Sequence, residues 1–406
     1  MKKTRLDAKN MVRRTFLLAG PALFTGRSGL AKLSQVAPRV WNFGAQQPHW
    51  KPLEVRTGDT ILVSAKVGGL PVRAILDSGS GATMLSTTLA AKLGIDKGER
   101  RTISGLSAKA PVQLVRDVDV SFGGEIRRLS FAVVADLTAA SAAFGRPIDA
   151  LLGADMFAGS CIALDFANKR LAVTKTGSFL GGADWRCIGL GRGSKQELLI
   201  RASIAGLADV PVMIDLGNST ALMLGADYVR EQGLMRSKAA STVALGGVDG
   251  IKTNDIFTTP HLDIAGFGVP NVPTLVMRDW LPTSTVGNIG LPLIGQFDAV
   301  FDVSAEALWF RKLDPHHRLM MLKDRSGLGF AALSTALSVI HVAANSPAAR
   351  GGWSVGDRIV AVNGHRINAN YTSGDLWRWR FGSPKTIVKL TLASGEEREL
   401  ELYDYY

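Results

Sequence analysis

Two stretches of the chain place an aspartate at the end of an apolar run and follow it, one residue later, with a glycine. The first is AILDSGSGATMLS at residues 74–86, and the second is VMIDLGNSTALML at residues 212–224. A short apolar run bounded by small, turn-forming residues indicates a buried strand that ends in a tight turn. Asp77 and Asp215 are therefore expected at two strand ends, 138 positions apart in the chain.

The elements around the two aspartates recur in the same order. In each copy a β-hairpin leads to the aspartate, a short helical segment ending at glycine follows it, and a polar, glycine-bearing hairpin comes next. Alternating strands and a final pair of strands complete each copy. The matching segments are 59–77 and 197–215, 87–94 and 225–233, 101–114 and 241–254, 115–136 and 261–277, and 162–173 and 299–310. A repeat this ordered predicts two lobes of one fold.

Each copy also reaches an apolar pair followed by glycine. The triplets are Leu151-Leu152-Gly153 in the first copy and Leu293-Ile294-Gly295 in the second. They follow the two aspartates at similar intervals, so we expect them to be equivalent positions of the repeat. The first lobe is expected over residues 53–176 and the second over residues 196–313.

The net charge of +12 is concentrated at one end of the chain. Residues 1–39 hold nine basic side chains against one acidic side chain, which leaves +4 for the remainder. No basic stripe interleaved with aromatic residues follows, so a nucleic-acid partner is not expected. No run of about 18 to 20 apolar residues is present, so the sequence does not predict a conventional membrane span.

Residues 1–40 are expected to be an export leader or a disordered tail. The segment RRTFLLAGPALF places Arg13 and Arg14 before a short apolar stretch, and this arrangement resembles a twin-arginine export signal. The signal favours the periplasm or the bacterial cell envelope as the destination. No clean A-x-A cleavage site follows, so an uncleaved leader that associates with the membrane is the alternative.

Cysteine and histidine indicate no metal chemistry. Cys161 and Cys187 are the two cysteines, and both a disulfide between them and two buried free thiols remain open. The six histidines show no ligand spacing with cysteine or glutamate, so no metal is expected. A phosphate loop and a full dinucleotide fingerprint are missing from the sequence, and no cofactor is expected.

Equivalent turns of two lobes would bring Asp77 and Asp215 together across the lobe interface. Two carboxylates within hydrogen-bonding reach share a proton, because both cannot ionise cheaply. One can then accept a proton from water while the other donates a proton to a carbonyl oxygen, which hydrolyses an amide without a covalent intermediate. A single aspartate in a turn more simply accepts local backbone N–H bonds, and the duplication favours catalysis instead.

The apolar frame of Asp77-Ser78-Gly79, the later Leu151-Leu152-Gly153 and the duplicated layout resemble the retropepsin-like and pepsin-like aspartic proteases over roughly residues 53–313. The resemblance implies a mainly β, pseudo-symmetric fold of two lobes, the acid protease barrel. It implies that Ser78 bonds across to the opposite lobe, that Gly79 lets N–H groups approach the carboxylates, and that Ser80 offers a polar group to the outer carboxylate oxygen. The polar hairpins would act as substrate-covering flaps, or would simply be exposed hairpins.

The second copy departs from this family pattern. Leu216 stands where the family has Ser or Thr, so half of the cross-lobe hydroxyl network is missing. Gly217 is kept, and the amide N–H of Asn218 is expected to serve the carboxylate oxygen. The departure motivates an alternative function, a catalytically degenerate peptide-binding or scaffold protein of the cell envelope. A further variant builds the active site from the Asp77 lobes of two chains in a homodimer and leaves Asp215 structural.

The C-terminal residues 315–403 resemble a PDZ domain. SPAARGGWSVGDRIVAVNG at residues 346–364 matches the middle of bacterial PDZ domains. In such a domain the backbone N–H groups of the loop cradle a peptide C-terminus, and the alternative is that the loop only packs the domain. The matching loop residues are Gly327, Leu328, Gly329 and Phe330. The sequence thus predicts an exported aspartic endopeptidase, acting on protein or peptide substrates, whose PDZ domain recognises peptide C-termini.

Overall fold

The computed structural model describes residues 39–406 apart from 56–57, 59, 105–108, 139–140, 142–145, 237–238, 248–249, 282–283 and 373. The chain forms two units, Met1–Val40 and Trp41–Tyr406, and the strands found among the described residues belong to the second. The leader expected at residues 1–40 lies outside the described residues except for Arg39 and Val40, so export stays a prediction. No helix in the described part of the chain has the length and apolar character needed to cross a membrane.

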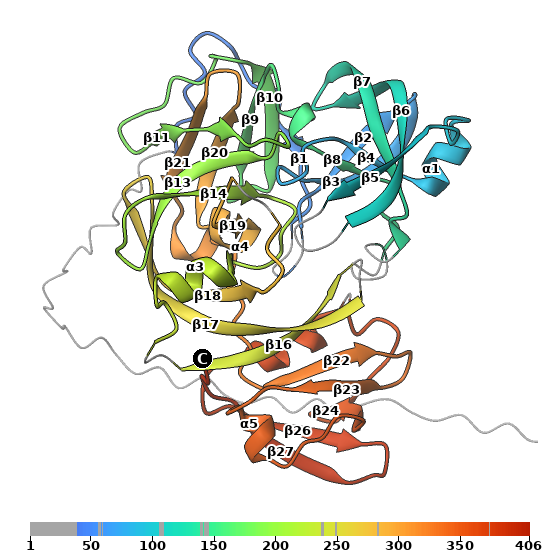
Figure 1. Cartoon of the computed structure of the whole chain (residues 1–406), viewed down its shortest axis with the longest axis vertical. Helices are drawn as coiled ribbons and strands as arrows, with labels where there is room; N and C mark the ends of the chain where they lie inside the picture. Colours follow the sequence, from blue (N-terminus) through green and yellow to red (C-terminus); the bar gives the residue numbers. More distant parts are fainter. Residues whose placement is uncertain are drawn as a thin grey trace, which may run out of the picture. The chain divides into compact units, whose positions relative to one another are not determined.

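The first half of the second unit is a seven-stranded sheet that closes on itself (Figure 1). The strand order is β2-β3-β8-β4-β7-β6-β5, and β2 pairs with β6 as well as with β3, so six strands form a barrel. The hairpin predicted before Asp77 is β2 and β3, which are joined through Gly68 and Gly69 at positive φ. The elements are β2 (Leu62–Val67), β3 (Leu70–Leu76), β4 (Met84–Ser86), α1 (Thr87–Lys92), β5 (Glu99–Ser104), β6 (Lys109–Phe122), β7 (Glu125–Ala135), β8 (Ala150–Leu152) and η1 (Ala154–Met156).

The second half repeats this sheet strand for strand. Its order is β13-β14-β19-β15-β18-β17-β16, with β12 added at the edge, and β13 pairs with β17 as β2 pairs with β6. Both predicted helices end just before a glycine with positive φ, Gly94 after α1 and Gly233 after α3. The predicted repeat is therefore confirmed. The elements are β12 (Gly191–Arg192), β13 (Leu198–Ile204), β14 (Val210–Asp215), β15 (Leu222–Gly225), α3 (Ala226–Glu231), β16 (Ala240–Gly247), β17 (Gly250–Ile264), β18 (Phe267–Met277), β19 (Gly287–Gly290) and α4 (Leu291–Ile294).

One equivalence predicted from the sequence is wrong. β8 runs parallel to β3 and β19 runs parallel to β14, and these registers make Gly153 equivalent to Gly290 rather than to Gly295. A Cβ on Gly153 would lie 2.9 Å from the Ser80 carbonyl oxygen, and one on Gly290 would lie 2.7 Å from the Asn218 carbonyl oxygen. Both glycines therefore let the backbone pack against the turn after the aspartate. The segment IGLPLIG contains the apolar-glycine pattern twice, and only the strand register distinguishes the two.

A third sheet joins the two halves. The final strand pairs predicted in each copy lie side by side, since β9 and β20 pair antiparallel with Ala163 opposite Val300. The six strands run in the order β1-β10-β9-β20-β21-β11. Because each half contributes strands on one side of the β9–β20 seam, the sheet fixes the two barrels relative to each other. The strands are β1 (Lys51–Pro52), β9 (Ser160–Asp165), β10 (Arg170–Lys175), β11 (Arg186–Gly189), β20 (Phe297–Asp302) and β21 (Ala307–Lys312).

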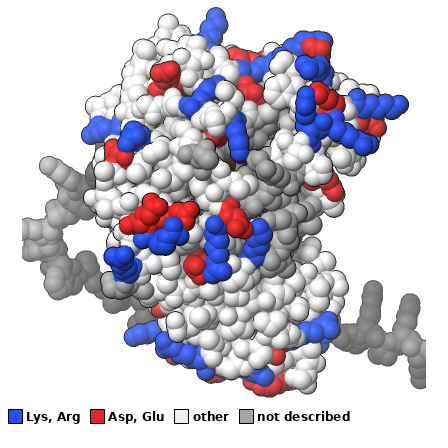
Figure 2. Space-filling model, viewed as in Figure 1, with Lys and Arg blue, Asp and Glu red and all other residues white. Residues whose placement is uncertain are grey.

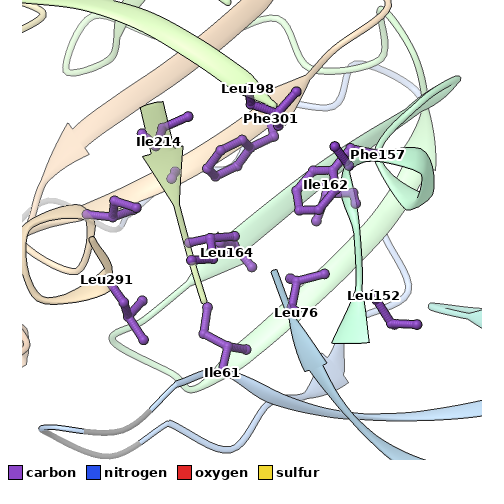
Figure 3. Close-up of a cluster of buried hydrophobic side chains, with 14 of the residues drawn as sticks. Ile61, Leu76, Leu152, Phe157, Ile162, Leu164, Leu198, Ile214, Leu291 and Phe301 are labelled. Atoms are coloured by element: carbon purple, nitrogen blue, oxygen red, sulfur yellow. The ribbon is translucent and has the colours of Figure 1, made fainter. Parts of the chain in front are cut away.

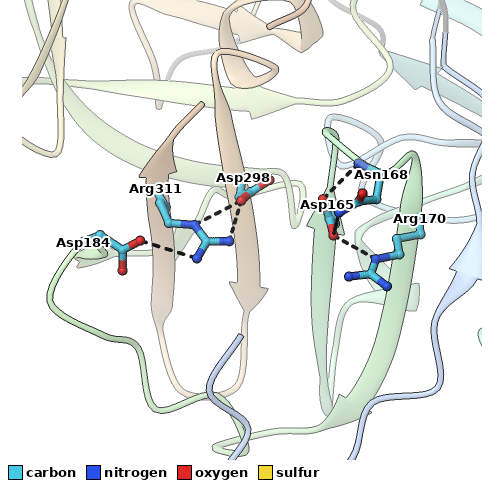
Figure 4. A network of polar contacts seen from close by, with 6 residues as sticks. All are labelled: Asp165, Asn168, Arg170, Asp184, Asp298 and Arg311. Atoms are coloured by element: carbon cyan, nitrogen blue, oxygen red, sulfur yellow. Dashed lines mark hydrogen bonds and ion pairs between the residues drawn. The ribbon is translucent and has the colours of Figure 1, made fainter. Parts of the chain in front are cut away.

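Ion pairs with buried aspartates tie the strands of this shared sheet together (Figure 4). Arg311 donates to Asp298 on the neighbouring strand at 3.1 and 2.7 Å, and both side chains are nearly or fully buried. On the other half, Asp165 accepts from Arg170 at 2.8 Å. The Arg311 guanidinium also stacks over Trp185, with 4.5 Å from Cζ to the ring centroid. Buried ions need partners of this kind, because desolvation of an isolated charge costs several kcal/mol.

The main hydrophobic core runs through both barrels and the shared sheet (Figure 3). Side chains of β3, β14, β9 and β20 converge there, and the residue before each aspartate, Leu76 or Ile214, is fully buried. Full burial of such a side chain stabilises the fold by roughly 1.5–3 kcal/mol. The apolar approach to each aspartate therefore anchors a strand end, and the turn that follows is held in a fixed position.

Residues 328–402, which we call the C-terminal module, form a fourth sheet with its own core. The strand order is β22-β23-β24-β26-β27, and β25 pairs with β24. Trp377 and Trp379 pack against this core. The elements are β22 (Leu328–Ala332), β23 (Leu337–Val342), α5 (Pro347–Arg350), β24 (Arg358–Val362), β25 (His365–Arg366), η3 (Leu376–Phe381), β26 (Ile387–Leu392) and β27 (Glu397–Glu401), and the short helix η2 (Pro315–His317) precedes them.

Candidate functional site

Asp77 and Asp215 lie at the carboxyl ends of β3 and β14, where the sequence predicts them. The Asp77 N–H donates to the Leu152 carbonyl oxygen of the parallel strand β8 at 2.9 Å. Asp215 is the last residue of β14 and is paired in register with the parallel strand β19. Each aspartate is thus positioned by a buried parallel strand of its own barrel.

The two carboxyl groups meet across the lobes within hydrogen-bonding reach. A Cβ on Gly79 would lie 2.3 Å from the Asp215 Cγ, and a Cβ on Gly217 would lie 2.6 Å from the Asp77 Cγ. Any side chain at either glycine would therefore collide with the opposite carboxyl group. Asp215 is 7% exposed and Asp77 is partly exposed, so the pair is open to solvent through Asp77.

Burial raises the pKa of both carboxyl groups above the ordinary value for aspartate. For Asp77 the neighbouring charge of Asp215 adds to the effect of burial, so its pKa lies well above the usual range. For Asp215, donation from the Asn288 amide and the Gly217 N–H opposes the effect of burial on the pKa. The side-chain donor on Asp215 favours ionisation of Asp215 over ionisation of Asp77.

The two carboxyl groups accept different donors. Asp77 Oδ1 accepts the backbone N–H groups of Gly79 and Ser80, both at 3.1 Å. Asp215 Oδ1 accepts the Gly217 N–H at 2.8 Å, and its Oδ2 accepts the Asn288 Nδ2 at 2.7 Å. Asp215 therefore has a side-chain donor, Asn288, on its Oδ2. The donors found for Asp77 are backbone N–H groups, and both donate to its Oδ1.

The sequence did not predict the role of Asn288. It is fully buried, and it is paired in register with Met213 as Leu151 of the first lobe is paired with Ile75. A polar residue in an otherwise apolar strand was the signal that could have found it. Aligning Gly295 with Gly153 hid that signal. With this alignment Leu151 is compared with Leu293, whereas the strand register makes it equivalent to Asn288.

Ser78 spans the two lobes as the family resemblance implies. Its hydroxyl donates to the Ile214 carbonyl oxygen at 2.8 Å and accepts the Leu216 N–H at 3.0 Å. Ser78 and Leu216 are both fully buried. Leu216 has no polar side-chain atom and cannot make the equivalent hydrogen bonds to the first lobe. The side-chain hydrogen bonds between the two turns therefore come from Ser78.

Two expected contacts take a different form. The Ser80 hydroxyl donates to the Ala82 carbonyl oxygen at 2.8 Å, so Ser80 serves the carboxylate through its backbone N–H alone. The Asn218 side-chain amide donates to Asn288 Oδ1 at 2.9 Å, and the expected contact with Asp215 comes from the Asn218 backbone N–H, which lowers the pKa of that carboxyl group. Both side chains find a nearer partner within their own lobe, which motif spacing alone does not reveal.

Asp155 anchors the first turn from behind, a role that the sequence did not indicate. Its carboxylate accepts the Thr83 N–H at 2.8 Å and the Thr83 hydroxyl at 2.7 Å. Thr83 Oγ1 also accepts the Gly153 N–H at 3.2 Å. This contact holds the far end of the turn and lies away from the carboxyl pair.

The polar hairpins predicted beside the site are β5 with β6 and β16 with β17. Their tips, residues 105–108 and 248–249, lie outside the described residues. β16 lies beside the C-terminal module (Figure 1), where Ser241 Oγ donates to the Ala344 carbonyl oxygen at 2.5 Å and Thr242 Oγ1 lies 3.0 Å from His341 Nε2. The module therefore anchors the second hairpin, which the sequence did not predict.

The loop expected to bind a peptide C-terminus lies at the start of β22, an edge strand of the module. The Gly327 N–H donates to Asp324 Oδ1 at 3.1 Å, and the Leu328 N–H donates to Ser326 Oγ at 3.1 Å. Two backbone N–H groups of the loop therefore already donate to side chains of the same chain, Asp324 and Ser326. The loop residues Gly327, Leu328, Gly329 and Phe330 are all described, and the last three form ladder pairs with β23.

The two cysteines are free thiols, Cys161 buried and Cys187 exposed. No disulfide forms, and the expectation that both thiols are buried is right for Cys161 only. Within the described ranges, no group of three or more His, Cys, Asp or Glu side chains has the geometry to hold a metal ion. On the face shown in Figure 2, Lys and Arg side chains lie interspersed with Asp and Glu side chains.

Comparison with known proteins bears on the first barrel. Residues 63–156 match the family model described as aspartyl protease, Asp_protease_2. The matched range begins in β2, contains Asp77 with the turn that follows it, and ends with η1. A search of curated proteins found no match to the chain.

Proposed function

We propose that the chain is an aspartic-type peptidase with a protein substrate and that Asp77 and Asp215 are its catalytic pair, because residues 63–156 match the aspartyl protease family model. The meeting of the two carboxyl groups, each opposite the other lobe's glycine, is the observation that carries this proposal. One chain supplies both carboxyl groups, so the arrangement needs no second copy.

The asymmetry of the pair assigns the roles. Ionised Asp215 takes a proton from water as the water oxygen attacks the carbonyl carbon, and protonated Asp77 gives its proton to the carbonyl oxygen. The tetrahedral diol then collapses. Asp215 returns its proton to the leaving nitrogen, Asp77 takes a proton from a diol hydroxyl, and the C–N bond breaks. The pair ends with the proton on Asp77, as it began.

Hydrolysis of a peptide library by the full chain between pH 3 and pH 8 tests this proposal. Asp77→Asn and Asp215→Asn are each expected to lower kcat/KM by about 10²- to 10⁴-fold, the usual contribution of an acid or base. Asp227→Asn is the matched control, because that side chain is 82% exposed on α3. Hydrolysis that survives both active-site substitutions would exclude the pair.

Leu216 favours a second candidate, a protein that binds peptides without hydrolysing them. Its apolar side chain leaves the cross-lobe connection to the single hydroxyl of Ser78. This candidate predicts saturable peptide binding by wild type with no cleavage, and a gain of turnover in Leu216→Thr. A wild-type chain that cleaves peptides contradicts it.

We also propose that the C-terminal module is PDZ-like and binds extended peptide C-termini. β22 is an edge strand, and an exposed edge can accept a peptide as an added strand. The peptide carboxylate would compete with Asp324 for the Gly327 N–H. Fluorescence anisotropy should show binding of peptides with a free C-terminus and not of the same peptides amidated, and equal binding of both would contradict the proposal.

Export to the periplasm or cell envelope is a further proposal, supported by Arg13, Arg14 and the apolar stretch after them. A reporter protein fused after residue 40 should appear in the periplasm, and Lys-Lys in place of the two arginines should retain it in the cytoplasm. Unchanged export of the Lys-Lys variant would contradict a twin-arginine route. Fractionation of the wild-type fusion would separate a cleaved leader from one that stays at the membrane.

A further inference from the structure

A chain of buried side-chain amides leads to Asp215 in the second lobe. Asn218 Nδ2 donates to Asn288 Oδ1 at 2.9 Å, and Asn288 Nδ2 donates to Asp215 Oδ2 at 2.7 Å. Asn288 is fully buried and Asn218 is 8% exposed. At the equivalent register position, the first lobe has Leu151, which cannot donate.

The direction of this amide chain is fixed by the backbone. An amide side chain can in principle turn over and exchange its oxygen for its nitrogen. Asn218 Oδ1, however, accepts the Thr220 backbone N–H at 2.8 Å, and that N–H can only donate. Asn218 must therefore present its nitrogen to Asn288, and Asn288 must present its own nitrogen to Asp215.

The fixed direction matters because Asn288 can only offer hydrogen to Asp215 Oδ2. That oxygen must then provide a lone pair, which favours an ionised Asp215 and disfavours a proton on Oδ2. Among the described residues Asp77 is the titratable group in contact with Asp215, and β14, β19 and the turn after Asp215 otherwise bring Gly217, Asn218 and Asn288. The amide chain is therefore the feature that distinguishes the two carboxyl groups.

We infer that Asn288, oriented through Asn218 and Thr220, is a positioning residue that keeps Asp215 as the base and leaves the shared proton on Asp77. The inference rests on the proposed catalytic pair and adds to it an assignment of roles.

Asn288→Leu, which copies Leu151 of the first lobe, tests the inference. Loss of a hydrogen bond to a charged group should move the acidic limb of the kcat/KM profile to higher pH by about one to two units, with kcat/KM below the limb about 10- to 100-fold lower. KM should change little, since the residue does not touch substrate. Asn218→Ala should move the limb in the same direction by less, and it serves if Asn288→Leu does not fold. A limb that stays in place in folded variants, even if activity falls, would overturn the inference.

A second readout does not depend on hydrolysis. Carboxyl ¹³C NMR of the full chain should show Asp215 ionising before Asp77 in wild type, and the order should weaken or reverse in Asn288→Leu. The exposed Gln47→Leu is the matched control and should leave both titrations unchanged. If wild type cleaves no peptide but the Asp215 titration still depends on Asn288, the proposed hydrolysis fails and the positioning role stands. If wild type cleaves peptides and the titrations do not respond to Asn288, the positioning role fails alone.

Discussion

In the first lobe the side-chain contacts that hold the turn after Asp77 lie away from its carboxyl group, where Thr83 binds Asp155. In the second lobe the corresponding contacts lead through Asn218 and Asn288 to the carboxyl group of Asp215 itself. The strand order of the two lobes is the same, so the backbone does not distinguish them. Duplication thus supplies the symmetric placement of two acids, and a few side chains make the two acids chemically different.

The cross-lobe contacts differ in the same way. Ser78 of the first lobe donates to and accepts from the backbone of the second, whereas Leu216 only fills space. The first lobe therefore supplies the side-chain hydrogen bonds between the turns that follow the two aspartates. The second lobe supplies the side-chain donor that favours the ionised form of Asp215. Substitutions at equivalent positions of the two lobes should accordingly have unequal effects, except where the geometry itself is symmetric.

The largest effect is expected at the symmetric glycines. Gly79→Ala and Gly217→Ala would each place a Cβ closer to the opposite carboxyl carbon than any real contact allows, at 2.3 and 2.6 Å. A displacement of about 1 Å in an active site costs on the order of 100-fold in rate, so both variants should lose at least that much kcat/KM. Gly189→Ala is the control, because nothing lies within 4 Å of the added Cβ. Normal activity in either active-site variant would mean that the carboxyl groups do not meet.

Ser78→Ala should lower the free energy of unfolding by about 2–4 kcal/mol. The substitution removes two buried hydrogen bonds and leaves the Leu216 N–H without its acceptor, and each unsatisfied buried group costs about 1–3 kcal/mol. Urea unfolding followed by circular dichroism measures the loss, with the exposed Ser64→Ala as a control. A loss no larger than that of Ser64→Ala would show that the first lobe does not carry the connection.

The raised pKa of Asp77 predicts how stability depends on pH. Burial and the charge of Asp215 keep Asp77 protonated in the folded chain over a range where it is ionised in the unfolded chain. The folded state then binds more protons, so stability from Asp77 is full below the unfolded pKa and is lost as pH rises through the folded pKa. Each pH unit between these two values is worth about 1.4 kcal/mol.

Asp77→Asn should remove this dependence. Unfolding free energies measured from pH 3 to pH 8 should fall less steeply with rising pH in Asp77→Asn than in wild type. The Ser64→Ala curve should run parallel to that of wild type. Parallel curves for Asp77→Asn and wild type would contradict the burial of a protonated Asp77.

The duplicated fold could be predicted from the sequence because its signals are local. An apolar run ending in Asp-x-Gly marks a buried strand and a turn, and the same order of elements recurs after Asp77 and Asp215. Ser78 and the glycines also follow from the motif. Asn288 could not be found in this way, because its position opposite Met213 depends on the register of two parallel strands distant in sequence.

The contacts between the two lobes, and between the second lobe and the C-terminal module, could not be predicted from the sequence for a related physical reason. The strands around Ala163 and Val300 were predicted individually, but nothing local indicates that they pair with each other to form the shared sheet. The contact of β16 with the C-terminal module includes the hydrogen bond between Thr242 and His341. Nothing in the sequence around either residue indicates this partner. Long-range pairing of this kind is decided by the tertiary fold and not by local propensity.

The docking of β16 gives the smallest expected effect and a direct comparison of the two hairpins. The pair Thr242→Val and His341→Ala removes one hydrogen bond between β16 and the module, which is worth about 1 kcal/mol. Hydrogen exchange of the β16 amides should therefore accelerate about fivefold, while exchange in β5 should not change. Because β5 is the equivalent strand of the first lobe, its amides in the same sample are the internal control. Equal acceleration in both hairpins would point to a general loss of stability, and no acceleration in β16 would show that the module does not hold the second hairpin in place.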